Sequence, residues 1–161
     1  MVLLKAKGLS LLVWLVVCFA AAFIGGLASV NAGAFYGELR QPAWAPPGYV
    51  FGPVWTLLYA LMAVAIWRVW VRAPALRQPA VWLFLLQLSV NALWSWLFFA
   101  WQLGAAALLD IVVLLSLLVA TVWQFRRFDK TAAWLLAPYV GWVSFAGVLN
   151  YTVWRLNPGL L

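Results

Sequence analysis

The sequence is most informative in what it lacks: it has no histidine, one cysteine and three acidic residues among 161. With Cys18 alone, an intramolecular disulfide and a cysteine-based metal site are impossible. The usual residues that ligate haem iron strongly are also missing from any pocket in the spans predicted below. No acid–base dyad, activated nucleophile, phosphate-binding loop or metal cluster is recognisable. Conventional hydrolysis or group transfer is therefore not expected, and neither is a metal site or a required cofactor.

Charge is equally scarce, at 8% of residues against 68% hydrophobic ones, whereas soluble domains carry roughly 25% charged residues. A helix needs about 20 apolar residues to cross a bilayer. Five stretches meet this length, near 9–30, 51–70, 80–101, 105–125 and 132–154. The sequence thus predicts an all-α integral membrane protein. One domain over 1–161 forms a compact bundle of five transmembrane helices, with a Pro- and Trp-rich loop between the first two.

The basic residues follow the membrane rather than forming the clustered groove of a nucleic-acid binder, despite a net charge of +7. With five crossings, eight of them fall on one side: Lys5, Lys7, Arg68, Arg72, Arg77, Arg126, Arg127 and Lys130. Only Arg40 and Arg155 fall on the other. The positive-inside rule then predicts a cytoplasmic N-terminus and an external C-terminus, in a membrane of the bacterial cytoplasmic type. The lipid bilayer is the expected partner, and nucleic acid is not.

The connection around residues 41–53 contains four prolines. Three of them fit a stiff, extended loop, and Pro53 fits the first turn of the second helix, where its missing N–H has no cost. Trp55 lies one turn further on and shares a helix face with Tyr59. This spacing predicts a two-ring wall. Trp44 and Tyr49 either anchor the loop among lipid headgroups or belong to the same site.

The third predicted helix carries Gln87, Asn91, Trp94 and Phe98 on one stripe. Amide side chains at membrane depth normally face the bundle interior. Two interpretations remain open for Asn91, namely a hydrogen bond between helices and the lining of a pocket. Trp94 on the same stripe favours a pocket.

The fourth helix carries Asp110, the one acid inside a predicted span, with Ala106 and Val113 on its face. An unpaired carboxylate there is costly, so Asp110 is protonated, hydrogen-bonded to a neighbouring helix or part of a proton or ion path. A structural hydrogen bond is the favoured interpretation for Asp110, and Ala106, Asp110 and Val113 are also candidate ligand-binding residues on this face.

The fifth helix presents Tyr139, Trp142, Ala146 and Leu149 on one face, and Pro138, Gly141 and Gly147 allow a bend or a close helix approach. The small Ala146 leaves space beside Trp142. Near its end, Leu149, Tyr151 and Arg155 match a weak pattern proposed for cholesterol contact. Interfacial anchoring of Tyr151 and Arg155 is the favoured interpretation.

Tryptophan, by contrast, is unusually abundant, with 13 residues. Indoles are enriched at membrane interfaces, and this explains those close to span ends: Trp67, Trp70, Trp82, Trp101, Trp123, Trp134 and Trp154. Trp55, Trp94 and Trp142 instead fall inside three different helices. Their positions indicate a flat, aromatic ligand that stacks against indole rings.

The chain resembles the translocator protein family, also called tryptophan-rich sensory proteins, TspO or peripheral benzodiazepine receptor homologues. The motifs that carry the resemblance are WAPP at 44–47, GPVWTLLY at 52–59, NALW at 91–94, FF at 98–99, ALLD at 107–110, PYVGW at 138–142 and LNYTVWR at 149–155. They extend over nearly the whole chain.

The resemblance implies a five-helix bundle, commonly a homodimer, whose first loop covers a pocket for porphyrins and for synthetic isoquinoline carboxamide or benzodiazepine-type drugs. By position it implies a lining of Phe51, Gly52, Val54, Trp55, Asn91, Trp94, Trp142, Ala146 and Leu149. It also implies that tryptophans at Trp55 and Trp142 take part in light-dependent porphyrin breakdown. Animal members have a tryptophan where Ala106 stands, so this pocket wall is less aromatic here.

Four functions are compatible with these sequence features. The first is a receptor or sensor that binds a tetrapyrrole such as protoporphyrin IX, metal-free because axial iron ligands are missing. The second is an enzyme that degrades porphyrin in light. The third is a transporter of porphyrin- or sterol-like molecules through Asn91 and Asp110, for which five helices form a thin wall. The fourth is a purely structural membrane subunit.

Overall fold

The structure is a computed structural model that describes residues 2–72 and 78–161, and it is helical with no strand in these ranges. Its elements are α1 (Val2–Ala28), α2 (Ala32–Glu38), the 3₁₀ turn η1 (Gly48–Val50), α3 (Phe51–Arg72), α4 (Gln78–Ser95), the π turn η2 (Trp96–Ala100), α5 (Gly104–Phe128), α6 (Lys130–Leu135) and α7 (Ala137–Leu156). Five stretches are long and apolar enough to cross a membrane: Gly8–Ala28, Gly48–Arg72, Gln78–Ala100, Gly104–Phe128 and Lys130–Leu156. The predicted fold class is confirmed.

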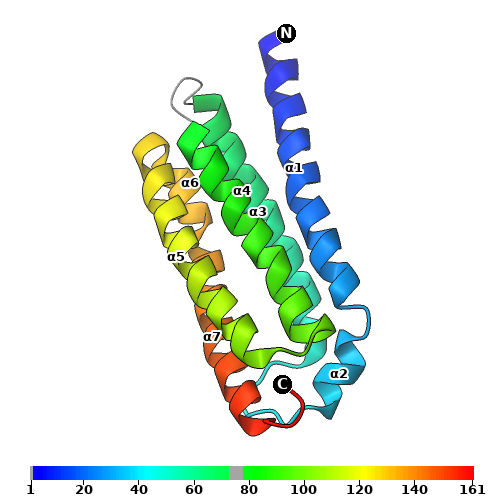
Figure 1. The fold of residues 1–161 in the computed structure, drawn as a ribbon. Coiled ribbons are helices and arrows are strands. Elements are labelled where there is room, and N and C mark those ends of the chain that lie inside the picture. The colour runs from blue at the N-terminus through cyan, green and yellow to red at the C-terminus, as the bar shows by residue number, and fades with distance from the viewer. Residues whose placement is uncertain (1, 73–77) are drawn as a thin grey trace.

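The long helices run side by side, with the N-terminus at one end of the bundle and α2 and the C-terminus at the other (Figure 1). In the packing, α1 contacts α3 and α4, α4 contacts α5, and α5 contacts α6 and α7. The short α6 also packs on α3 and so closes the ring of helices. Hereafter the two ends of the bundle are called the N-terminal end and the α2 end.

Proline sets two helix boundaries. Pro53 lies in the first turn of α3, as predicted. The predicted fifth helix, near 132–154, is instead two helices, α6 and α7, which meet at Leu136. Pro138 is the cause, because it has no N–H to donate and its ring excludes the carbonyl four residues earlier from a regular turn. The predicted bend is therefore a break.

The last turn of the third span is a π turn, which the sequence pattern did not predict. Its hydrogen bond joins the N–H of Trp101 to the carbonyl of Trp96 at 2.8 Å. Gln102 follows in the left-handed region, with φ of 55°. A π turn holds more residues than an α turn, so neighbouring side chains diverge less around the axis. Phe98 and Phe99 both lie in this turn.

The tryptophans divide broadly as their positions predict. Trp82, Trp101, Trp123 and Trp134 are more than half exposed on the protein surface. Trp14, for which the sequence analysis made no prediction, is buried and meets Trp70 and Phe84 edge to face, with ring centroids 5.6 and 5.9 Å apart. These rings pack α1 against α3 and α4 toward the N-terminal end.

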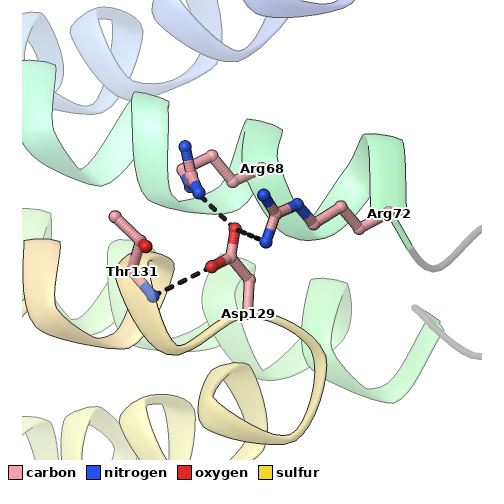
Figure 2. A network of polar contacts seen from close by, with 4 residues as sticks. All are labelled: Arg68, Arg72, Asp129 and Thr131. Atoms are coloured by element: carbon pink, nitrogen blue, oxygen red, sulfur yellow. Dashed lines mark hydrogen bonds and ion pairs between the residues drawn. The ribbon is translucent and has the colours of Figure 1, made fainter.

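An ion cluster at Asp129 fixes the junction of α5 and α6 to the end of α3 (Figure 2). Asp129 Oδ2 accepts from Arg68 Nε at 2.7 Å and lies 3.0 Å from Arg72 Nη1. Its Oδ1 accepts from the backbone N–H of Thr131 at 2.9 Å and caps α6. The carboxylate side chain is 1% exposed. Removing one partner from such a buried pair leaves an uncompensated charge.

Burial alone raises the pKa of Asp129, but the hydrogen bonds from Arg68 and from the Thr131 backbone outweigh it and hold the pKa below 3.8. A folded-state pKa below the unfolded value means that the ionised carboxylate stabilises the fold. This stabilisation is fully present above pH 3.8 and is lost as the pH falls through the lower folded pKa.

We expect Asp129→Asn to lower the free energy of unfolding by about 2–4 kcal/mol, because it removes the charge that Arg68 and Arg72 compensate. Thermal unfolding followed by circular dichroism in detergent measures this. Glu38→Gln is the matched control, since Glu38 is exposed and forms no ion pair within the described residues. The loss of stability in acid should also be weaker in the Asp129→Asn variant than in the wild type. Equal unfolding midpoints for wild type and Asp129→Asn would contradict the role of the cluster.

Candidate ligand-binding site

A cavity of about 390 Å³ lies toward the α2 end of the bundle. Side chains and backbone of α1, α2, η1, α3, α4, η2 and α7 line it, whereas α5 contributes none of the lining residues. The lining is mostly aromatic or small, and none of its residues in the described part of the chain is charged. A volume of this size is typical of small-molecule sites, which are largely apolar with few polar groups.

Eight of the predicted binding residues line this cavity. They come from three helices and are Phe51, Gly52, Trp55, Tyr59, Asn91, Trp94, Ala146 and Leu149. The stripe on the third span also contributes Phe98, whereas Gln87 lies deeper in the bundle. Periodicity therefore identified the correct faces of α3, α4 and α7.

Five predicted residues lie outside the lining. Val54, Ala106, Asp110, Val113 and Trp142 do not line the cavity. The three on α5 are excluded because α5 packs between α4 and α7, away from the cavity, and Val113 is 45% exposed on the outer surface. Trp142 packs edge to face against Phe51, with ring centroids 5.8 Å apart. Phe51 lines the cavity and Trp142 does not.

Asn91 connects two helices and lines the cavity at once. Its Oδ1 accepts from the Tyr59 hydroxyl at 2.5 Å, and both residues are buried. The two interpretations of Asn91, as a hydrogen bond between helices and as pocket lining, therefore apply together. Because water is absent at this depth, the pair satisfies polar groups that would otherwise be costly to bury.

The Trp94 indole is held in a fixed orientation. Its Nε1 donates to Asn150 Oδ1 at 3.1 Å, and Asn150 Nδ2 donates to the Gly104 carbonyl at 3.0 Å. Gly104 is required at this contact, since an added Cβ would lie 2.8 Å from Trp154 Cδ1. The indole is also stacked on Phe98, with centroids 5.3 Å apart and an interplanar angle of 16°. The cavity therefore has one rigid aromatic face before any ligand enters.

A second aromatic face comes from α3. The rings of Trp55 and Tyr59 lie 5.8 Å apart, as the predicted two-ring wall requires, and Tyr139 packs edge to face against Trp55 at 6.1 Å. Two aromatic faces on different helices suit a flat ligand, because aromatic rings prefer offset-stacked or edge-to-face contacts.

The first connection covers part of the cavity at the α2 end, where the lining residues Gly48 and Gly52 remain exposed. Asn157 Oδ1 accepts from the backbone N–H of Arg40, and Asn157 Nδ2 donates to the Arg40 carbonyl, both at 2.9 Å. Tyr36 of α2 lines the cavity and meets Phe51 edge to face at 5.6 Å. Trp44 packs against Phe145 at 5.9 Å and is 48% exposed, and the Tyr49 side chain is 81% exposed. The loop is thus fastened to the end of α7.

The α1 and α2 side of the cavity was not predicted from the sequence. Small residues dominate there: Ala22, Gly25, Gly26, Ser29, Ala32 and Gly33. The packing is close, because a Cβ on Gly25 would lie 3.2 Å from Ser95 Oγ. The spacing of Ala22, Gly25 and Ser29 is helical, but small residues also serve helix packing. This signal alone does not separate a cavity wall from a helix contact.

Asp110 is 8% exposed, and its Oδ2 has no hydrogen-bond partner within the described residues. The hydrogen bond favoured for this residue is therefore not found at that oxygen. The buried Gln87 Nε2 is likewise unpartnered there, although Gln87 Oε1 accepts from the Tyr139 hydroxyl at 3.1 Å.

The cholesterol pattern does not form one surface. Leu149 is buried and lines the cavity, whereas Tyr151 and Arg155 are exposed on the outer side of α7. No group of three or more cysteine, aspartate or glutamate residues that could hold a metal ion occurs within the described residues.

Comparison with known proteins identifies the family of this chain. The model of the TspO/MBR family matches residues 14–155. The tryptophan-rich protein TspO of Chlorobaculum tepidum is 40% identical over 146 residues, which cover 88% of this chain and 91% of that protein. Protein CrtK of Rhodobacter capsulatus is 38% identical, covering 91% and 92%. The human translocator protein is 36% identical, covering 78% and 76%. The resemblance stated from the motifs is confirmed.

Proposed function

Because the chain belongs to the TspO/MBR family, we propose that it is a membrane receptor or sensor that binds a planar tetrapyrrole such as protoporphyrin IX, or a hydrophobic drug-like molecule, in the cavity at the α2 end. Family membership supports the membrane sensor or receptor role in general. The specific ligand rests on one observation, an uncharged cavity with the Trp94–Phe98 stack on one helix span and the Trp55–Tyr59 pair on another.

The chemistry of the lining favours a metal-free macrocycle. The described lining contains no cysteine or methionine, and the chain has no histidine, so among the common axial ligands of haem iron only tyrosine, in Tyr36 and Tyr59, is present. The few polar groups suit neutral hydrogen-bonding atoms, and Asn91 and Tyr59 are the central ones. The carboxylates of a porphyrin then belong at the mouth of the cavity, where water and lipid headgroups compensate their charge.

Two narrower roles follow from the same cavity as hypotheses. Light-dependent porphyrin breakdown would use the indole of Trp55, which lines the cavity, more directly than that of Trp142, which does not. Transport through Asp110 finds less support, because Asp110 lies outside the lining. We further expect a homodimer, as the family resemblance implies.

We expect Trp55→Phe and Trp94→Phe each to weaken protoporphyrin IX binding roughly two- to tenfold, because a smaller ring loses aromatic contact. Absorbance titration of the purified protein in detergent measures the dissociation constant. Trp134→Phe is the control, since Trp134 is 75% exposed on the outer surface of α6. Trp142→Phe should change binding less than either lining variant. Unsaturable binding by the wild type, or affinities unchanged in both lining variants, would overturn the proposal.

We also propose that the N-terminal end of the bundle faces the cytoplasm. The described basic residues Arg68, Arg72, Arg126, Arg127 and Lys130 lie at that end, and Arg40 and Arg155 lie at the other. The positive-inside rule favours this orientation.

A reporter fused to the C-terminus tests the orientation. Alkaline phosphatase should be active there and green fluorescent protein dark, because only the former folds outside the cytoplasm in active form. Fusions that end at Lys130 are the control and should give the opposite pattern. A fluorescent C-terminal fusion with inactive phosphatase would contradict the orientation.

A further inference from the structure

A second hollow lies on the outer surface, away from the ligand cavity and toward the N-terminal end. It is a groove between α4 and α5, and it is separate from every residue of the cavity. Its walls are mainly apolar and include Trp82, Leu83, Leu86, Ala120, Trp123 and Gln124. In a membrane-spanning chain this surface faces lipid.

Two indoles flank the groove from opposite helices. Trp82 of α4 is 69% exposed and Trp123 of α5 is 59% exposed. Indoles at span ends are commonly anchors at the headgroup level, and these positions agree with that level. Here they also line one apolar groove, called the channel below, together with Leu83 and the small Ala120.

A cation stands over one of these indoles. The guanidinium carbon of Arg127 lies 3.6 Å from the centroid of the Trp123 ring. Such stacking uses the face of the guanidinium and leaves its N–H edge available for bidentate bonds to phosphate. Arg127 is exposed and forms no ion pair within the described residues. A positively charged donor therefore lies at the headgroup end of the apolar channel.

We propose that this groove binds one anionic phospholipid. An acyl chain occupies the channel between Trp82 and Trp123, the lipid phosphate contacts the N–H edge of Arg127, and the Gln124 amide hydrogen-bonds to a headgroup oxygen. The positive charge at this end of the bundle favours an anionic lipid over a neutral one. Arg126 and Lys130 near Arg127 are also exposed, and basic residues beside the membrane attract anionic headgroups.

A second copy of the chain fits the groove less well. A two-fold dimer in a membrane would place the same end of each copy at the same depth. The partner's own basic end would then lie beside Arg127, and like charges would oppose each other. A lipid supplies both the apolar chain and the compensating negative charge.

Native mass spectrometry on protein released from mixed micelles tests the site with two lipids of equal chain length, phosphatidylglycerol and phosphatidylcholine. We expect one phosphatidylglycerol to be retained in preference. Arg127→Gln should reduce its retention about fivefold, as expected for one basic residue near a membrane surface. Arg126→Gln is the matched control, with the same charge change one residue away; it removes general attraction to anionic headgroups but no contact with the Trp123 ring, so its loss should be smaller than that of Arg127→Gln.

A second variant tests the groove independently of charge. Ala120→Phe fills the channel while Arg127 remains, so we expect it to reduce retention of phosphatidylglycerol at least as strongly. Ala120→Leu serves the same purpose if the larger ring prevents folding, and thermal midpoints verify each variant. Equal retention of the two lipids, equal losses in Arg127→Gln and Arg126→Gln, or displacement of the lipid by inorganic phosphate at equal concentration would overturn the proposal.

Discussion

Water is absent from the hydrocarbon core of a membrane, so polar groups inside this bundle are satisfied mainly by other parts of the chain, although Asp110 Oδ2 and Gln87 Nε2 have no partner within the described residues. The Tyr59–Asn91 pair joins α3 to α4. The contacts from Trp94 through Asn150 to the Gly104 carbonyl join α4, α7 and the start of α5. These bonds fix the relative positions of the helices and also the orientation of the rings around the cavity. The stability of the bundle and the shape of the site thus rest on the same side chains.

The two ends of the bundle are held differently. At the N-terminal end, the charges of Arg68 and Arg72 meet the buried Asp129, where lipid headgroups and water begin. At the α2 end, Asn157 pairs with both backbone groups of Arg40 and fastens the first connection over the cavity. Ion pairs therefore lie at the N-terminal end, while neutral amides and hydroxyls, together with the buried acid Asp110, serve the interior. This division leaves the cavity without a charged lining and suits it to apolar, aromatic ligands.

The sequence predicted the fold well, because hydropathy and span length are strong signals in a membrane protein. It located the lining faces of α3, α4 and α7, where helical spacing combines aromatic and amide residues such as Trp55 and Asn91. Ala106 and Val113, which were also predicted as binding residues, do not line this cavity, because a periodic face does not reveal which neighbour it meets. The small lining residues of α1, such as Ala22 and Gly25, were not predicted, because small residues are equally typical of helix–helix packing. The π turn that carries Phe98 and Phe99 has no periodic signature in the sequence.

We propose that the ligand lies between α1, α3, α4 and α7 and not against α5. A structure of the protein with bound protoporphyrin IX tests this most directly. We expect a macrocycle in contact with Trp55 and Trp94, with its carboxylates at the mouth of the cavity and no contact with α5. A macrocycle bound against Ala106 and Val113, or on the outer surface of the bundle, would contradict it.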